Sequence, residues 1–536
     1  MSGPDPMAGE PHVVALDLGT SGPKTLVVSL SGRIAGIGRT FVDTIHVPGG
    51  GAEQDAQALW EAVKGSIAQA LKVAVVSPCD IRAVICSSQY SSIVPVDAAG
   101  SPLANMILWL DQRGTARNLR RTARFPRGTD QPLQLLDWLW VHGLAPVAGG
   151  MSLNHMRFLK YVRPEVYART AFLLEPMDYV AMRLTGRATA TQCTSFMSLL
   201  MDNRAGASHG YHRRLLRYGQ IDQEKLPEAI PVDAVIGGVL PRIAEDLGLE
   251  PGTKVIAGMG DTHAGGMGSL AFQGAHCGLA MGSSSVLVTH RAKKGTDLRN
   301  ALFALPSPVV GQYFAVAEAG ISGLALDSFL HQTIFAEDSF AGGSVLPEGP
   351  ARYAALERAV AGVEPGAEGL IYLPWLTGSL APRTDSQMRG GFINMSPRMT
   401  RSHMARAVLE GIALNLRWSR DPMQKFCGRE FSHFLFYGGG AQSDICAQIM
   451  ADVLQRPIHQ LDHAQHITAL GAALTAFARL KMIEPGDFAS RVRARRVVEP
   501  NSLLESLYDE RFEQFTAAFK ALRPLSHRMN SGHIVS

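Results

Sequence analysis

The chain has 536 residues, which is long enough for two or more domains with well-developed cores. Apolar residues make up 46%, and the net charge is only +4 with Lys and Arg dispersed. This balance argues against nucleic acid or an anionic membrane as a partner.

The 54 glycines and 30 prolines indicate many turns, as in an α/β protein. The six cysteines lie far apart and include no Cys-x-x-Cys pair, so neither a disulfide framework nor a zinc site is expected. Residues 1–10 lack the basic start and apolar core of a signal peptide. No apolar run approaches the roughly 20 residues of a membrane helix. We therefore expect a cytoplasmic protein with reduced thiols.

The first predicted strand, residues 12–18, ends in a polar glycine turn with the sequence GTSGPK. Residues 25–30 and 33–39 follow as two strands of a hairpin. Backbone N–H groups and hydroxyls of such a turn can hold phosphate, while Asp17 can hold a hydrated Mg²⁺. Lys24 could meet a phosphate as a point charge. A plain hairpin with a solvated lysine would have the same pattern.

Two polar segments follow predicted strands farther along. An amphipathic helix over residues 55–73, with Asp55 as its N-cap, precedes a strand over residues 81–86 and the polar insert SSQYSS. That insert is either a floor for a hydroxylated ligand or simply a turn. The strand in ILWLDQR ends in Asp111 and Arg113, which together can bind vicinal hydroxyls. A structural salt bridge between them would look identical in the sequence.

Residues 131–186 have mostly helical patterns, with helix starts at Pro164 and Pro176. Residues 254–286 then contain two apolar strands. The first ends at a carboxylate, Asp261, in a glycine-rich turn, and the second ends in GSSS from Gly282. A carboxylate beside a bare, hydroxyl-lined turn suits phosphoryl transfer, although two ordinary strand ends would give the same pattern. We interpret this stretch as the hinge between two halves.

In the second half, the polar loop over residues 377–389 is predicted to be a cleft lid or an inter-domain latch. A strand over residues 434–437 leads into GGGAQS and then a helix, so a flat or anionic ligand could approach the backbone there. The last helix is predicted over residues 503–522, with a frayed end after Pro524.

Five elements occur in one order: DLGTSGPK, ILWLDQR, GMGDTHAGGMG, MGSSS, and GGGAQS followed by ADVL. This set resembles the FGGY carbohydrate kinases, within the sugar kinase/Hsp70/actin superfamily, over about residues 12–480. The resemblance implies an α/β chain with two ribonuclease H-like (actin-like ATPase) domains and an inter-domain cleft. The expected divisions are residues 12–262, residues 263–500, and a C-terminal helix and tail over residues 501–536.

The resemblance also implies roles for individual residues. Asp261 matches the catalytic base that takes the proton of the sugar hydroxyl, and Asp17 would hold Mg²⁺. The residues implied to bind ATP are Asp17, Thr20, Ser21, Lys24, Gly282, Ser283, Gly323, Gly439 and Ser443. The residues implied to lie near the sugar are Gln89, Tyr90, Ser91, Asp111, Arg113 and Asp261.

The sequence departs from the family pattern at the sugar end. Xylulokinases usually carry GQMHG where this chain has Ser88-Gln89-Tyr90-Ser91-Ser92. We expect an ATP-dependent kinase of a small-molecule sugar, with a ketopentose such as xylulose as the first hypothesis. Another ketose, a polyol such as erythritol or glycerol, and a catalytically silent sugar- or ATP-binding regulator remain alternatives. An ATPase with water as acceptor is a third class. The oligomeric state stays open, a homodimer being one alternative.

Overall fold

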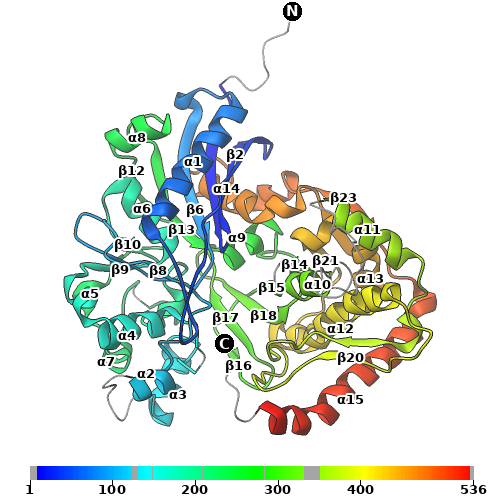
Figure 1. Cartoon of the computed structure of the whole chain (residues 1–536). Coiled ribbons are helices and arrows are strands. Elements are labelled where there is room, and N and C mark those ends of the chain that lie inside the picture. The colour runs from blue at the N-terminus through cyan, green and yellow to red at the C-terminus, as the bar shows by residue number, and fades with distance from the viewer. Residues whose placement is uncertain are drawn as a thin grey trace, which may run out of the picture.

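Two β-sheets of similar construction, one from each half of the chain, form the framework of the computed structural model (Figure 1). The structure describes residues 9–122, 125, 130–147, 149–207, 209–282, 284–330 and 350–530. In that part of the chain, no helix combines the length and the hydropathy needed to cross a membrane.

The first sheet has six strands, and its inner strands are buried because both of its faces are covered by helices. β1 pairs antiparallel with β2 and parallel with β6, and β6 pairs parallel with β13. The strand order is β12 (Val235–Gly238), β13 (Lys254–Gly260), β6 (Ile81–Ser88), β1 (His12–Gly19), β2 (Gly22–Ser29) and β3 (Ile34–Arg39).

The second sheet repeats the inner order of the first. Strands β18-β15-β14-β21-β22 have the same sequence of antiparallel and parallel pairs as β3-β2-β1-β6-β13. This repeat confirms the expected fold class of two ribonuclease H-like units. The strand order is β16 (Thr296–Asp297), β17 (Leu302–Pro306), β18 (Tyr313–Ile321), β15 (Ser284–Arg291), β14 (Cys277–Met281), β21 (Phe434–Tyr437), β22 (Ile458–Leu461) and β23 (Ala494–Val498).

Helices cover both sheets. α1 (Ala56–Ala74) begins as predicted, because the Asp55 carboxylate accepts the N–H groups of Gln57 and Ala58 at 2.8 and 2.9 Å. The other helices of the first half are α2 (Ala116–Thr122), α3 (Pro132–Val141), α4 (Ser152–Val162), α5 (Pro164–Arg169), α6 (Pro176–Thr185), α7 (Arg213–Gly219) and α8 (Pro241–Leu247). Those that follow are α9 (Asp261–Gly268), α10 (Gly323–Phe329), α11 (Pro350–Ala361), α12 (Arg401–Cys427), α13 (Asp444–Leu454), α14 (Ile467–Arg479) and α15 (Glu505–Asn530).

In the part of the chain that the structure describes, short strands form four further small sheets in the connections. They are β4 (Ile45–Val47) with β5 (Gly51–Gln54) and β8 (Met106–Ile107), β7 (Val94–Val96) with β9 (Phe172–Leu174), β10 (Thr189–Ala190) with β11 (Glu228–Ala229), and β19 (Ile371–Leu373) with β20 (Gly391–Ile393).

The prediction of a glycine-rich turn around Asp261 is wrong, because α9 begins at that residue. Glycine is a poor helix former, yet here it allows close packing of α9 on α14. A Cβ on Gly268 would lie 2.1 Å from the Ile467 carbonyl oxygen, and one on Gly471 would lie 2.1 Å from that of Ala264. The sequence therefore carries glycines where two helices approach through their backbones.

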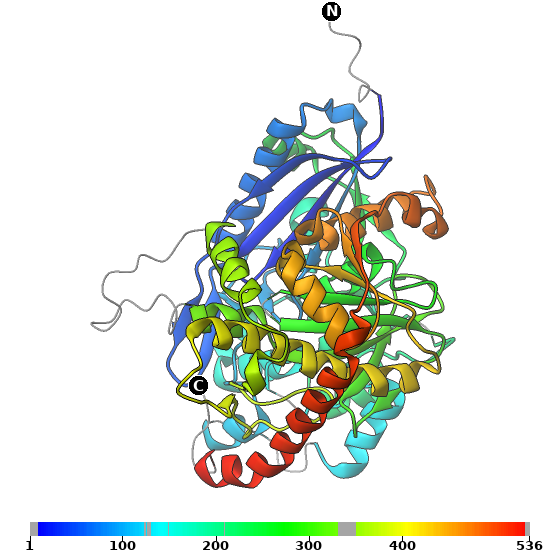
Figure 2. The same ribbon diagram turned by 90° about the vertical axis from the view of Figure 1, so that its right-hand side faces the viewer.

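The C-terminal helix is also longer than predicted. α15 continues through Pro524 to Asn530, and Figure 2 shows it running along the outside of the second half. Arg523 Nε and His527 Nε2 both lie 2.7 Å from the carboxylate of Asp385. These contacts attach the loop over residues 377–389 to the helix and hold the last turns in place, which sequence propensity alone did not indicate.

Side chains from both halves share one buried cluster between the sheets. Val13 and Ala15 of β1 pack in the same cluster as Leu470 and Ala473 of α14. α14 belongs to the second half by sequence, yet it lies against β1, β2 and β6 of the first sheet. The two halves are therefore joined through their cores as well as by the connecting chain.

Candidate active site

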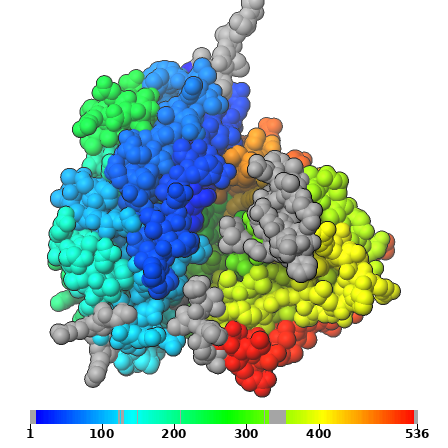
Figure 3. All heavy atoms as spheres, in the orientation of Figure 1, coloured from blue at the N-terminus to red at the C-terminus, as the bar shows by residue number. Residues whose placement is uncertain are grey.

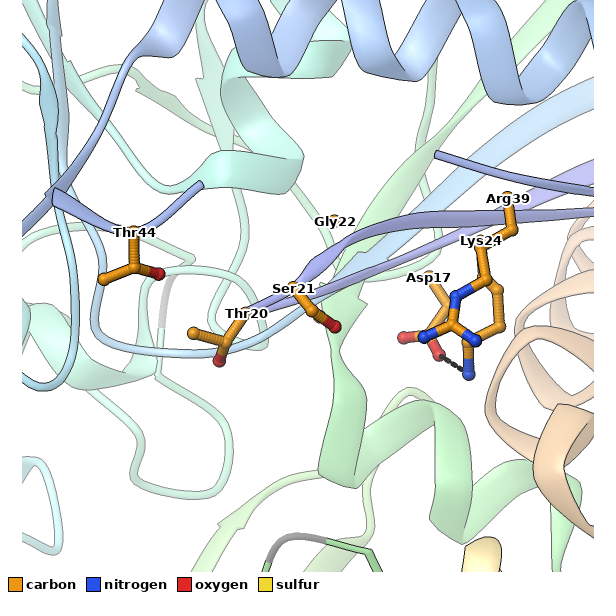
Figure 4. Close-up of a pocket in the computed structure, with 8 residues that line it drawn as sticks. Asp17, Thr20, Ser21, Gly22, Lys24, Arg39 and Thr44 are labelled. Atoms are coloured by element: carbon orange, nitrogen blue, oxygen red, sulfur yellow. Dashed lines mark ion pairs between the residues drawn. The ribbon is translucent and has the colours of Figure 1, made fainter. Parts of the chain in front are cut away.

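A cavity of about 360 Å³ opens at the turn between β1 and β2. Figure 4 shows the side chains of Asp17, Lys24 and Arg39 gathered at one end of it. Asp17 and Lys24 are cross-strand partners, with the ammonium nitrogen 3.9 Å from the carboxylate Oδ2. The lining residues are Asp17, Gly19, Thr20, Ser21, Gly22, Lys24, Arg39 and Thr44. Two cations, hydroxyls and a bare turn together form a setting for an anionic group.

Arg39 and Thr44 were not among the residues predicted from the sequence. Arg39 ends β3 and lies opposite Lys24 in the β2–β3 ladder. The side chains of directly paired residues lie on the same face of a sheet, so both cations reach the cavity. The register of the predicted hairpin was the signal that could have identified Arg39.

Asp17 is the carboxylate at this end of the cavity. Burial raises its pKa, while the charge of Lys24 and a hydrogen bond involving Ser87 act in the opposite direction. A bound cation would favour its ionised form. In the described residues, no group of three or more His, Cys, Asp or Glu side chains could enclose a metal ion. One carboxylate beside hydroxyls suits a Mg²⁺ ion that keeps most of its ligands as water and phosphate.

Asp261 lies at the start of α9, immediately after β13. Its Oδ1 accepts the backbone N–H of Thr262 at 2.6 Å. The side chain is exposed to solvent, yet the surrounding protein desolvates it and raises its pKa to about 7, with the negative charges of Asp17 and Glu318 adding to the shift. β1 and β13 flank β6 in parallel, so their carboxyl ends bring Asp17 and Asp261 to the same edge of the sheet.

Thr20 connects the β1–β2 turn to two other segments. Its hydroxyl donates to Gln89 Oε1 at 2.6 Å and accepts the indole N–H of Trp109 at 3.1 Å. The structure thus brings Gln89, which was predicted near the sugar, beside the cavity. Trp109 is 39% exposed and was not among the predicted site residues, although it belongs to the same ILWLDQR motif.

Asp111 and Arg113 form a buried charged group with Glu53. The strand predicted in ILWLDQR already ends at Ile107, and the chain turns so that Arg113 Nε lies 2.9 Å from the Asp111 carboxylate. Arg113 Nη2 lies 2.6 Å from the same carboxylate and 2.5 Å from Glu53 Oε1. The Asp111 carboxylate also accepts the N–H of Ala52 at 3.1 Å. The Asp111 carboxylate and the Nε and Nη2 groups of Arg113 are therefore engaged inside the protein.

This arrangement gives a stability prediction. Asp111→Asn should lower the free energy of unfolding by about 3 kcal/mol, because it leaves the buried Arg113 short of a counter-charge. Glu228→Gln is the matched control, since its pair with Arg187 is largely exposed and its loss should cost less than about 1 kcal/mol. Chemical denaturation measures both. Equal effects of the two substitutions would contradict the structural role of Asp111.

Tyr90 and Ser91 lie in the loop after β6. The Tyr90 hydroxyl contacts Nδ1 of His263 and donates to the Cys193 carbonyl at 3.0 Å, so it faces the interior. Ser91 is 3% exposed and has a positive φ of 60°. Neither Tyr90 nor Ser91 is among the residues that line the cavity at the β1–β2 turn.

The residues predicted to hold the nucleotide come together from neighbouring strands. The N–H of Gly323 donates to the Gly282 carbonyl at 2.9 Å, and Ser443 caps α13 by accepting the N–H of Cys446 at 3.2 Å. Within the described chain, a Cβ built on Gly282 or Gly439 meets nothing within 4 Å, so both face open space. Ser283 lies outside the described residues.

The two halves face each other across a hollow that Figure 3 shows between the blue and the yellow-green surfaces. Lys24 Nζ lies 3.5 Å from the Gln465 carbonyl oxygen, and Arg479 of α14 donates to the Ala257 carbonyl of β13. The cavity residue Lys24 and the strand that leads to Asp261 thus both contact elements of the second half.

Comparisons with known proteins cover nearly the whole chain. The model of the FGGY family of carbohydrate kinases, N-terminal domain, matches residues 12–268, and that of the C-terminal domain matches residues 279–480. Xylulose kinase of Bacillus subtilis (strain 168) is 27% identical over 469 residues, 87% of each chain. Xylulose kinase of Staphylococcus epidermidis (strain ATCC 12228 / FDA PCI 1200) is 26% identical over 96% of this chain and 97% of the other.

Solved structures give the same result for the fold. The ligand-bound xylulose kinase from Lactobacillus acidophilus superposes with a TM-score of 0.81 at 22% identity, covering 96% of this chain and 98% of that one. The xylulose kinase from Rhodospirillum rubrum gives a TM-score of 0.79 at 25% identity, covering 96% and 100%.

Proposed function

Because the chain belongs to the FGGY family of carbohydrate kinases, which transfer phosphate from ATP to a sugar, we propose that its substrate is a ketopentose such as xylulose and that Asp261 is the general base. The relatives named xylulose kinase support the choice of sugar, since they match over most of both chains. The observation that carries the catalytic proposal is the position of Asp261 at the same sheet edge as Asp17, which lines the cavity with two cations and whose charge helps to raise the pKa of Asp261 to about 7.

The raised pKa suits the chemistry. A general base is most effective when its pKa lies near the working pH. A sugar hydroxyl becomes a good nucleophile only when it is aligned and loses its proton in the transition state. Asp261 accepts that proton as the hydroxyl oxygen bonds to the γ-phosphorus. The bond from this phosphorus to the β–γ bridging oxygen breaks, and ADP leaves with the electron pair.

The cavity residues bind and orient the phosphates. Lys24 and Arg39 offer positive charge, and the Thr20-Ser21-Gly22 turn offers N–H groups and hydroxyls. Asp17 would hold Mg²⁺, which when bound neutralises charge on the phosphate oxygens. In the second half, Gly282 and Ser283 would form the second phosphate turn, and Gly323, Gly439 and Ser443 would hold the nucleoside.

We further propose a division of labour between the halves. Residues 12–262 carry the sugar site and the first phosphate turn, residues 263–500 carry the second phosphate turn and the nucleoside site, and residues 501–536 form a C-terminal extension. Closure of one half on the other would exclude water and so protect ATP from hydrolysis.

Turnover of ATP over a panel of pentuloses, hexuloses and polyols tests the function. With Mg²⁺ present, xylulose should raise ADP formation at least about 100-fold above that of the Asp261→Ala variant. A larger increase with another ketose, erythritol or glycerol would reassign the substrate. If no compound raises turnover above that of the variant while ATP still binds, the kinase proposal fails and a silent binding protein is favoured.

A further inference from the structure

Four groups from distant segments form a closed hydrogen-bonded ring beside Asp261. The Tyr90 hydroxyl contacts His263 Nδ1 and the Cys193 carbonyl. On the other side, His263 Nε2 lies 2.6 Å from the Pro306 carbonyl oxygen, and the Cys193 thiol donates to the same oxygen at 3.4 Å. The ring therefore joins the loop after β6, the turn after β10, helix α9 and the end of β17.

The ring fixes the state of its imidazole. His263 is fully buried, and burial lowers its pKa to about 3, so the imidazole stays neutral at working pH. A carbonyl oxygen can only accept, so Nε2 carries the proton and Nδ1 is an acceptor, which shares the single proton of the Tyr90 hydroxyl with the Cys193 carbonyl. One tautomer thus satisfies the contacts on both sides of the imidazole.

Tyr90 also packs on the residue that precedes the base. A Cβ built on Gly260 would lie 2.0 Å from Cζ of the Tyr90 ring, and the Gly260 N–H interacts with the Tyr90 hydroxyl. Gly260 is the N-cap of α9, Asp261 follows it, and His263 is two residues farther on. Tyr90 therefore contacts the helix start on both sides of Asp261.

The ring crosses from one half of the molecule to the other. Tyr90 and Cys193 belong to the first half, whereas Pro306 ends β17 in the second sheet. α9 lies between them and packs against β13 of the first sheet as well as β14 and β15 of the second. Through Tyr90 and Pro306, the first turn of α9 therefore contacts both halves.

We propose that Tyr90 is a positioning residue rather than a sugar-binding one: with His263 it fixes the start of α9 and so aims the Asp261 carboxylate at the sugar hydroxyl. This role rests on the function proposed above. The segment over residues 88–92, which stands where xylulokinases carry GQMHG, would then help to orient the base through Tyr90.

Tyr90→Phe tests the role, because it keeps the aromatic ring on Gly260 and removes only the hydroxyl. We expect kcat with xylulose to fall by about tenfold to 100-fold, with KM for xylulose and ATP unchanged within about twofold. Tyr179→Phe is the matched control: it removes a tyrosine hydroxyl that donates to the Ala56 carbonyl at 3.2 Å on the outer helix α6. Its kcat should remain that of the wild type.

Two kinetic outcomes would overturn the proposal. A rise in KM for xylulose with kcat retained would mean that Tyr90 contacts the sugar, and unchanged kinetics would mean that the ring has no role in positioning. If Tyr90→Phe does not fold, substitutions of His263 test the hydrogen-bonded ring instead. His263→Ala should then lower kcat, and His263→Gln, whose amide can donate to the Pro306 carbonyl, should retain more of the wild-type kcat. A kcat equal to that of the wild type in both His263 variants would refute the proposal.

Nitrogen NMR of His263 separates this inference from the proposed function, since it needs no turnover. The wild type should show the neutral, Nε2-protonated tautomer from about pH 5 to about pH 8. Tyr90→Phe should shift the Nδ1 signal because it loses its hydrogen-bond donor. A protonated imidazole or the Nδ1-protonated tautomer in the wild type would refute the hydrogen-bonded ring, even if the sugar kinase activity is present.

Discussion

Replacing Asp261 by asparagine should lower kcat for sugar phosphorylation by about 10²–10⁴-fold while leaving ATP affinity nearly unchanged. Asparagine has the same shape but cannot accept the proton of the sugar hydroxyl. The residue lies at the start of α9, and its Oδ1 accepts the N–H of Thr262, a bond that the amide oxygen can still accept. Steady-state kinetics with xylulose and calorimetric ATP binding measure the two effects.

Glu318→Gln is the matched control for this substitution. Glu318 is a second carboxylate close enough to Asp261 to affect its pKa, and it has no assigned role in the transfer. Its kcat should stay within about threefold of the wild type. A loss in Asp261→Asn no larger than that in Glu318→Gln would exclude Asp261 as the base.

The activity should also disappear in mild acid. The pKa of Asp261 is raised to about 7, so the carboxylate is ionised above that pH and protonated below it. A base must be ionised to act, and kcat/KM should therefore fall about tenfold for each unit below pH 7, or about 100-fold at pH 5. Initial rates at saturating ATP and Mg²⁺ over this range, with protein stability checked at each pH, give the profile.

Glu318→Gln tests the assignment of that profile as well. The negative charge of Glu318 contributes to the raised pKa of Asp261, so its removal makes Asp261 easier to ionise. The acid limb should then move to lower pH than in the wild type. A shift to higher pH, or a wild-type limb centred near pH 4, would show that another group controls the profile.

Local patterns in the sequence were enough to predict much of the framework. Strands such as β1 and β21, and helices such as α1 and α13, have the length and period of their type and clear turn or cap residues at their ends. The order of five short motifs then predicted the paired sheets. That prediction depended on the resemblance, because local periodicity does not indicate which strands are neighbours.

The rest depended on contacts between residues far apart in sequence. The glycines of α9 predicted a turn, but the backbone of α14 packs against them and makes a helix favourable. Asp111 and Arg113 could equally have faced a sugar, and only the position of Glu53, in another segment, shows that their charges are neutralised internally. Tyr90 likewise meets His263 only in the folded chain.

The buried cluster that Val13 and Ala15 share with Leu470 and Ala473 affects how the chain folds during its synthesis. During synthesis the inner face of β1 stays uncovered until α14 has emerged, so the first half cannot complete its core alone. A fragment ending between the halves would expose this apolar face and be prone to aggregate. Unfolding should likewise involve both halves together, because opening either one removes part of the interior of the other.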